Sequence, residues 1–190
     1  MNNKPSIIVI GNGPSVLNKK YGNIIDNFDE VVRINHYKPS EHVGKKLTIF
    51  VTASWKTIFY SDVPILSKKI LIWKEHNILT PYDKFQQSEI MKKEPIINKL
   101  HKEFNFSIFP KSPWCSTGIA ILMYLILSDE YDKIYIYGFD NLVKGSVLHY
   151  FENIKVNTMD HSSELEKNFI NYYIKLGKLC KLEDSSYVKV

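Results

Sequence analysis

The sequence has little arginine, little cysteine and no long apolar run. Of its 25 basic residues only Arg33 is an arginine, whereas proteins that read nucleic acid usually gather the planar guanidinium group on their binding face. We therefore do not expect a nucleic-acid partner. The formal net charge of +5 comes from scattered lysines, which a solvated surface explains best.

Cysteine occurs only as Cys115 and Cys180, with no C-x-x-C pair and no Cys/His pair at zinc-ligand spacing. This pattern excludes a disulfide framework and a zinc finger, and we expect two reduced thiols. The longest apolar run, Ile119 to Leu127, is too short for a membrane span of about twenty residues and predicts a buried core helix.

The segment Met1 to Ser6 lacks the basic and apolar stretches of a signal peptide. We therefore expect a cytoplasmic protein, with peripheral contact at the inner face of a membrane as the second expectation. A chain of 190 residues supplies one good core. We expect one domain over residues 1–190.

Short β-branched runs alternate with helical or irregular segments along the chain. This alternation predicts an α/β fold whose central sheet is mostly parallel and flanked by helices. The polar stretch Pro81 to Lys102 reads as exposed helix and loop. The predicted strands are Ser6 to Ile10, Glu30 to Asn35, Leu47 to Val51, Lys69 to Trp73 and Ile134 to Tyr137.

The turn Gly11-Asn12-Gly13-Pro14-Ser15 follows the first predicted strand. Its glycines allow a sharp turn and close approach to a ligand, and its proline suits the first position of a helix. A dinucleotide fingerprint would need a further glycine at Val16 and an acidic residue at Asn35, so NAD binding is disfavoured. The alternative is a tight strand-to-helix turn without ligand.

A second turn, Ser112 to Gly118, precedes the apolar helix. Ser116 or Thr117 can cap that helix, and Gly118 keeps its first turn open, so a phosphate or carboxylate would fit there. A simple Ser/Thr N-cap is the other interpretation. Neither is excluded by the residues themselves.

A third segment follows the strand at residues 134–137 and contains two histidines, His149 and His161, which are candidates for acid/base chemistry near neutral pH. Inert surface histidines are the alternative. With Glu152 and Asp160 they could also form a metal site, although no helical ligand pair supports one. Ser163 and Glu166 form a capping box for a helix that Gly177 ends. The expected apolar face of that helix is Leu165, Phe169, Tyr173 and Leu176.

Four motifs in order resemble those of the sialyltransferases of glycosyltransferase family 29. They span Ile7 to Glu166: IIVIGNGPSVLNKKYGNIIDNFDEVVRIN resembles the long sialyl motif, CSTGIAILMYLILSDEYDKIYIYGFD the short motif, HYFE the HYY(D/E) motif and HSSELE the H-x-x-x-x-E motif. The GNGPS variant is also similar to the bacterial family 42 sialyltransferases. The resemblance implies a single Rossmann-like domain, a variant of the GT-A fold.

The resemblance also implies roles for individual residues. His161 would be the general base, His149 would bind the leaving phosphate with Tyr150 nearby, and Glu166 would support the acceptor end of the site. Contacts to the donor, a CMP-sugar, would come from Gly11, Asn12, Gly13, Asn35, Ser116, Thr117, Gly118, Gly138 and Phe139.

The implied reaction is an inverting transfer of sialic acid, or a related keto-sugar acid, to a hydroxyl of a glycan or lipid-linked glycan. No cofactor is expected, and no metal, because the leaving group is a monophosphate and the chain has no D-x-D motif. The alternatives are a transferase using CMP-Kdo or another nucleotide sugar, a non-catalytic nucleotide or sugar-nucleotide binding module, and a Rossmann-type enzyme using SAM or NAD.

Overall fold

The computed structural model describes residues 4–52, 69–72, 115–140, 146, 147, 149–153, 155 and 163–188, with residues 69–72 as backbone only. The described strands form one sheet in the order β4-β3-β2-β1-β5-β6. Their bounds are β1 Ile7–Ile10, β2 Glu30–Ile34, β3 Ile49–Thr52, β4 Lys69–Ile72, β5 Ile134–Tyr137 and β6 Leu179–Lys181. Every pairing between them is parallel, which confirms the predicted α/β class.

The strand order reverses between β1 and β5, which are neighbours in the sheet although far apart in the sequence. From β1 the chain builds outward through β2, β3 and β4, and only later returns to place β5 and β6 on the other side. Ligands of open α/β sheets bind beyond the carboxyl ends of the strands at such a switch point. A ligand site is therefore expected at the residues that follow β1 and β5.

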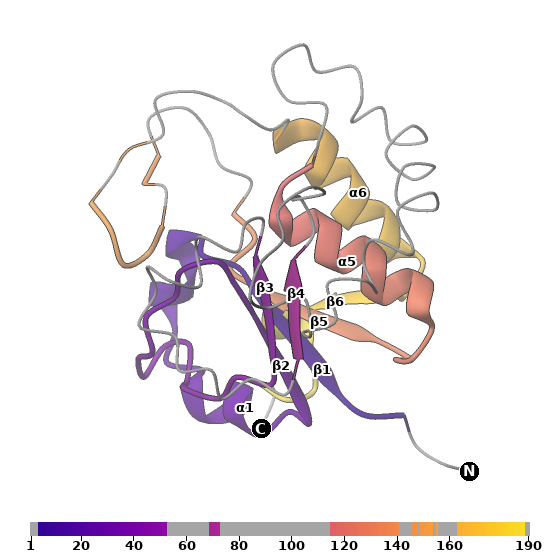
Figure 1. Ribbon diagram of the computed structural model, residues 1–190, viewed down its shortest axis with the longest axis horizontal. Helices are drawn as coiled ribbons and strands as arrows, with labels where there is room; N and C mark the ends of the chain where they lie inside the picture. The colour runs from indigo at the N-terminus through magenta and orange to yellow at the C-terminus, as the bar shows by residue number, and fades with distance from the viewer. Residues whose placement is uncertain are drawn as a thin grey trace, which may run out of the picture.

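Apolar side chains alternate between the two faces of the sheet and build a core on each. Helices α5 (Thr117–Ser128) and α6 (Ser163–Lys175) lie on one face, and α1 (Gly22–Asp26) lies on the other (Figure 1). The predicted buried helix is α5, whose residues Thr117 to Leu125 are all buried. None of the helices in the described ranges is long and apolar enough to cross a membrane.

The turn after β1 leads into a 3-10 helix, η1 (Pro14–Asn18), with its proline at the first position as expected. Strand β6, the short 3-10 helix η3 (Leu182–Asp184) and the 3-10 character of η1 were not predicted. The predicted exposed stretch Pro81 to Lys102 lies outside the described residues.

The predicted apolar face of α6 is wrong at its last member. Phe169 and Ile170 are buried against the α5 side of the sheet, whereas Leu176 is 57% exposed. The helix ends at Lys175, and Gly177 follows with a φ of 73°, as the stop signal predicted. The Leu176 amide still donates to the Tyr172 oxygen at 3.0 Å, but Leu176 lies beyond the last residue of α6 and its side chain is exposed.

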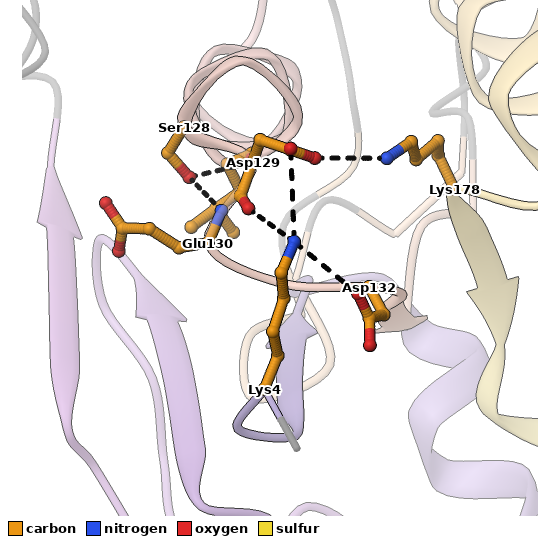
Figure 2. A network of polar contacts seen from close by, with 7 residues as sticks. Lys4, Ser128, Asp129, Glu130, Asp132 and Lys178 are labelled. Carbon is orange, nitrogen blue, oxygen red and sulfur yellow. Dashed lines mark hydrogen bonds and ion pairs between the residues drawn. The ribbon is translucent and has the colours of Figure 1, made fainter. Parts of the chain in front are cut away.

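A network of charged side chains links the chain segments at the amino-terminal edge of the sheet, opposite the carboxyl ends of the strands (Figure 2). Lys4 Nζ lies 3.4 Å from Asp132 and donates to the backbone oxygen of Asp129 at 2.7 Å, while Lys178 Nζ reaches the Asp129 carboxylate at 3.2 Å. The hydrogen bond from Lys178 and the charge of Lys4 lower the pKa of Asp129. These contacts join the segments that precede β1, β5 and β6. We therefore assign this edge of the sheet a role in the stability of the fold.

Candidate functional site

The backbones of β1 and β5 come unusually close where both strands end. Gly11 donates to the Tyr137 oxygen at 2.7 Å, and Gly13 donates to the Gly138 oxygen at 3.0 Å. A Cβ atom on Gly11 would lie 2.3 Å from that same Gly138 oxygen, and Gly138 itself has a φ of 75°. The predicted glycines are therefore required by the meeting of the two strands.

A carboxylate that the sequence analysis did not select closes this junction. Asp140, at the end of the GFD sequence, accepts a hydrogen bond from the Ser15 amide at 2.6 Å and another from the Ser15 hydroxyl. It thereby binds the first turn of η1 to the residues after β5. An acidic residue three positions after a buried strand, with a serine ending the glycine turn, was the available signal.

The two predicted donor-binding asparagines lie side by side at the ends of β1 and β2. The Asn12 Nδ2 group donates to the Ile34 oxygen at 2.9 Å and to the His36 oxygen at 2.8 Å, on either side of Asn35. Asn35 has a φ of 51°, in the left-handed region that few residues other than glycine adopt. The side chain of Asn12, which follows β1, thus stabilises the turn that contains Asn35.

The segment containing His149 and Tyr150 packs against the same ends of β1 and β2. The Tyr150 backbone amide donates to the Asn12 backbone oxygen at 2.9 Å. The Tyr150 hydroxyl accepts a hydrogen bond from the Lys38 amide and donates one to the Lys38 backbone oxygen. Burial raises the pKa of the Tyr150 phenol, which keeps it a neutral donor. The Nδ1 atom of His149 lies 2.8 Å from the Glu152 carboxylate, and its ring stacks on Phe151.

The chain's single arginine, Arg33, stabilises the segment that follows β2. Arg33 is only 1% exposed and donates to the oxygens of Val43 at 2.6 Å and Lys46 at 3.1 Å, with the Tyr37 ring 5.2 Å from its guanidinium carbon. Desolvation lowers its pKa, although guanidinium stays charged in proteins. Arginine here stabilises a buried turn, a use that the composition alone did not suggest.

The N-terminus of α5 holds a carboxylate from within the protein. Ser116 is the N-cap, and its hydroxyl oxygen accepts from the Ile119 amide at 3.3 Å, as predicted. Its own amide and hydroxyl donate to the two oxygens of Glu166, at 2.8 and 3.0 Å. The capping-box prediction kept Glu166 within its own helix, but its carboxylate reaches across to α5. Negative charge is favourable at that position.

Phe139 connects this helix terminus to the strand ends. A Cβ atom on Gly118 would lie 2.9 Å from the Phe139 ring, and one on Gly11 would lie 3.3 Å from it. Gly118 and Thr117 are buried. The small residue at the start of α5 therefore leaves room for an aromatic ring.

We expect the pair formed by Ser116 and Glu166 to be energetically coupled. Hydrogen bonds to a charged group contribute about 1.5–3 kcal/mol, so Glu166→Gln and Ser116→Ala should each lower the free energy of unfolding by roughly that amount. The double variant should lose less than the sum, by at least about 1 kcal/mol. Urea unfolding of the four proteins measures this coupling.

Glu164→Gln is the matched control, because Glu164 is exposed in the same first turn of α6. It should change the unfolding free energy by less than about 0.5 kcal/mol. Additive losses at Ser116 and Glu166 would contradict the contact.

The structure thus gathers two groups of predicted site residues at the carboxyl edge of the sheet. One comprises the turns at Gly11 to Gly13, Asn35, His149 and Tyr150, and the other comprises Ser116 to Gly118 with Glu166. Gly138 and Phe139 lie between them. His161 and Asp160 lie outside the described residues, within which no cluster of three or more potential metal ligands occurs.

Residues 5–94 match the family model of glycosyltransferase family 29 (sialyltransferase). The comparison with curated proteins gives no match.

Solved sialyltransferase structures share the fold. A mammalian sialyltransferase superposes with a TM-score of 0.64 at 18% identity, covering 95% of this chain and 70% of that one. The sialyltransferase CstII from Campylobacter jejuni, in complex with cytidine-5'-monophosphate, gives a TM-score of 0.65 at 18% identity, covering 100% and 84% of the two chains. The predicted Rossmann-like fold and the predicted similarity to a sialyltransferase enzyme are confirmed at this level. Residues 5–94 are thus similar to the sialyltransferases of glycosyltransferase family 29, and the chain has the fold of the solved sialyltransferase structures.

Proposed function

We propose that the chain transfers sialic acid from CMP-sialic acid to a hydroxyl of a glycan, with inversion at the anomeric carbon. The observation that carries this proposal is the position of Asn12, which donates hydrogen bonds to the residues on either side of Asn35. Both residues lie within the segment that matches the family 29 model, and their contacts bring them together beside the topological switch point. That is where an open α/β sheet binds a nucleotide.

The structural relatives support a cytidine nucleotide as the donor. The CstII structures hold CMP, the analogue CMP-3FNeuAc, or CMP with a trisaccharide acceptor. A mammalian relative was solved with a Gal-beta-1-3GalNAc compound. We extend the CMP-sugar donor and the glycan acceptor from those proteins to this chain.

On the donor side, we assign His149 to the leaving phosphate. Its Nδ1 atom lies 2.8 Å from Glu152, a contact that fixes the orientation of the ring. The other ring nitrogen, Nε2, is then the atom that we assign to donate to the phosphate oxygen as the bond to the anomeric carbon breaks. Preorganised donors of this kind stabilise charge that develops in the transition state.

On the acceptor side, we assign His161 as the general base that takes the proton of the acceptor hydroxyl. The hydroxyl oxygen forms a bond to the anomeric carbon while the bond to the phosphate oxygen of CMP breaks. Glu166 positions the first turn of α5 through Ser116. Since a monophosphate leaves, protein donors can balance its charge, and we propose a metal-independent reaction.

Thermal unfolding with CMP, CDP, UDP or NAD tests the donor assignment without knowledge of the acceptor. CMP at a hundred times its Kd adds about 2.7 kcal/mol, which should raise the midpoint by roughly 5–10 °C. The Asn35→Asp variant, which tolerates the left-handed backbone, should lose this rise. Asn27→Asp, at an exposed position after α1, should keep it. A rise with UDP or NAD but not with CMP would contradict the proposal.

A further inference from the structure

The backbone at Asn35 is held in a conformation that it would not adopt freely. Its φ of 51° lies in the left-handed region, directly after the last residue of β2. Its amide donates to the Val51 oxygen at 2.7 Å, as if β2 continued for one more residue. Such strained positions persist only where their surroundings hold them, and they concentrate at functional sites.

Asn12 supplies one part of that restraint. Its Nδ2 group donates to the carbonyl oxygens of Ile34 and His36, which flank Asn35 on both sides. A side-chain amide has two hydrogens on nitrogen, and both are used here. The amide nitrogen of Asn12 therefore serves the protein backbone, although the sequence analysis assigned this residue to the donor.

Tyr150 supplies the other part from a distant region of the chain. Its hydroxyl accepts from the Lys38 amide at 2.8 Å and donates to the Lys38 oxygen, while its own amide donates to the Asn12 oxygen at 2.9 Å. The segment from Asn35 to Lys38 is thus held at His36 by Asn12 and at Lys38 by Tyr150. Beneath it, Tyr37 lies against the buried guanidinium of Arg33.

We infer that Tyr150 and Asn12 are positioning residues that hold the Asn35 to Lys38 segment in its ligand-binding conformation. Because Tyr150 directly follows His149, the same hydrogen bonds place the group assigned to the leaving phosphate against the segment assigned to the nucleotide. Nucleotide binding and the orientation of His149 then both depend on the hydrogen bonds made by Tyr150 and Asn12. This inference rests on the proposed CMP-sugar donor.

Tyr150→Phe isolates the hydroxyl, because phenylalanine keeps the ring and the amide that donates to Asn12. Two hydrogen bonds to Lys38 are lost, so we expect the Kd for CMP, measured by calorimetry, to rise about tenfold. Amide hydrogen exchange of residues 35–38 in the ligand-free protein should become faster, with β1 and β5 unchanged. Tyr187→Phe, in an aromatic cluster with Phe28 and Tyr135, is the matched control and should leave both readouts unchanged.

A Tyr150→Phe protein with a lower thermal midpoint but a wild-type Kd for CMP would overturn the inference, since Tyr150 would then only stabilise the fold. Unchanged exchange at residues 35–38 would overturn it as well. Failure of the proposed function reads differently: the wild-type protein itself would show no CMP binding, and the inference would fall with its donor.

Discussion

His161→Ala should lower kcat by a factor of about 10²–10⁴ and leave the Kd for CMP unchanged. The reason is that proton removal and nucleotide binding are assigned to different residues. A base is needed only when the acceptor hydroxyl attacks, whereas we propose that the nucleotide binds at the strand ends, where Asn12 contacts the residues on either side of Asn35. Initial rates of sugar transfer at saturating donor, with calorimetry of CMP binding, separate the two effects.

His42→Ala is the control for this substitution. His42 lies after β2, where its Nδ1 atom is 3.0 Å from the Lys19 oxygen, and it has no role in the proposed reaction. Its rate should stay within about twofold of the wild-type rate. A His161→Ala protein that transfers at the wild-type rate would show that another group is the base. Loss of CMP binding instead would move His161 to the donor side of the site.

Gly11→Ala should strongly destabilise the junction between β1 and β5. The new methyl group would lie 2.3 Å from the Gly138 oxygen and 2.8 Å from the Gly138 carbonyl carbon, both of them backbone atoms of the neighbouring strand end. Backbone cannot rotate away as a side chain can, so β1 and β5 must separate where they flank the site. Overpacking costs up to about 3 kcal/mol, which corresponds to a midpoint lower by roughly 6–12 °C.

Gly177→Ala provides the comparison that distinguishes a clash from backbone strain. Gly177 has a φ of 73°, but nothing lies within 4 Å of the position that its Cβ would take. It should cost about 1 kcal/mol from the left-handed backbone alone, with CMP binding retained. Thermal scans of both variants with and without CMP decide the matter. Equal losses at the two glycines would contradict the close contact between β1 and β5.

Much of the fold could be predicted because the signals are local. The β-branched runs of β1 and β2 and the apolar run of α5 specify buried elements, and each was found within two residues of its observed bounds. Strand β6 was missed because Leu179, Cys180 and Lys181 form a run too short to show alternation. It is a strand because β5 offers it a parallel edge.

The site was predictable as a list of residues and much less as a set of contacts. The motif order identified Asn12, Asn35 and Tyr150, but the hydrogen bonds that join Asn12 to Ile34 and to Tyr150 span 22 and 138 residues of sequence and depend on the closed sheet. Glu166 was explained within its own helix, and only the structure shows its carboxylate on Ser116, 50 residues away. Arg33 was noted only as the single arginine, and its buried role was missed because its carbonyl partners lie in an irregular segment downstream.

The most direct test of the account is a transfer assay with three donors. The wild-type protein is incubated with CMP-sialic acid, CMP-Kdo or UDP-galactose and a Gal-beta-1-3GalNAc acceptor, the glycan bound by a mammalian relative, and both the released nucleotide and the modified glycan are measured. We expect CMP release from CMP-sialic acid in step with formation of a sialylated product. Transfer from UDP-galactose, with no reaction and no binding of either CMP-sugar, would contradict the proposed function.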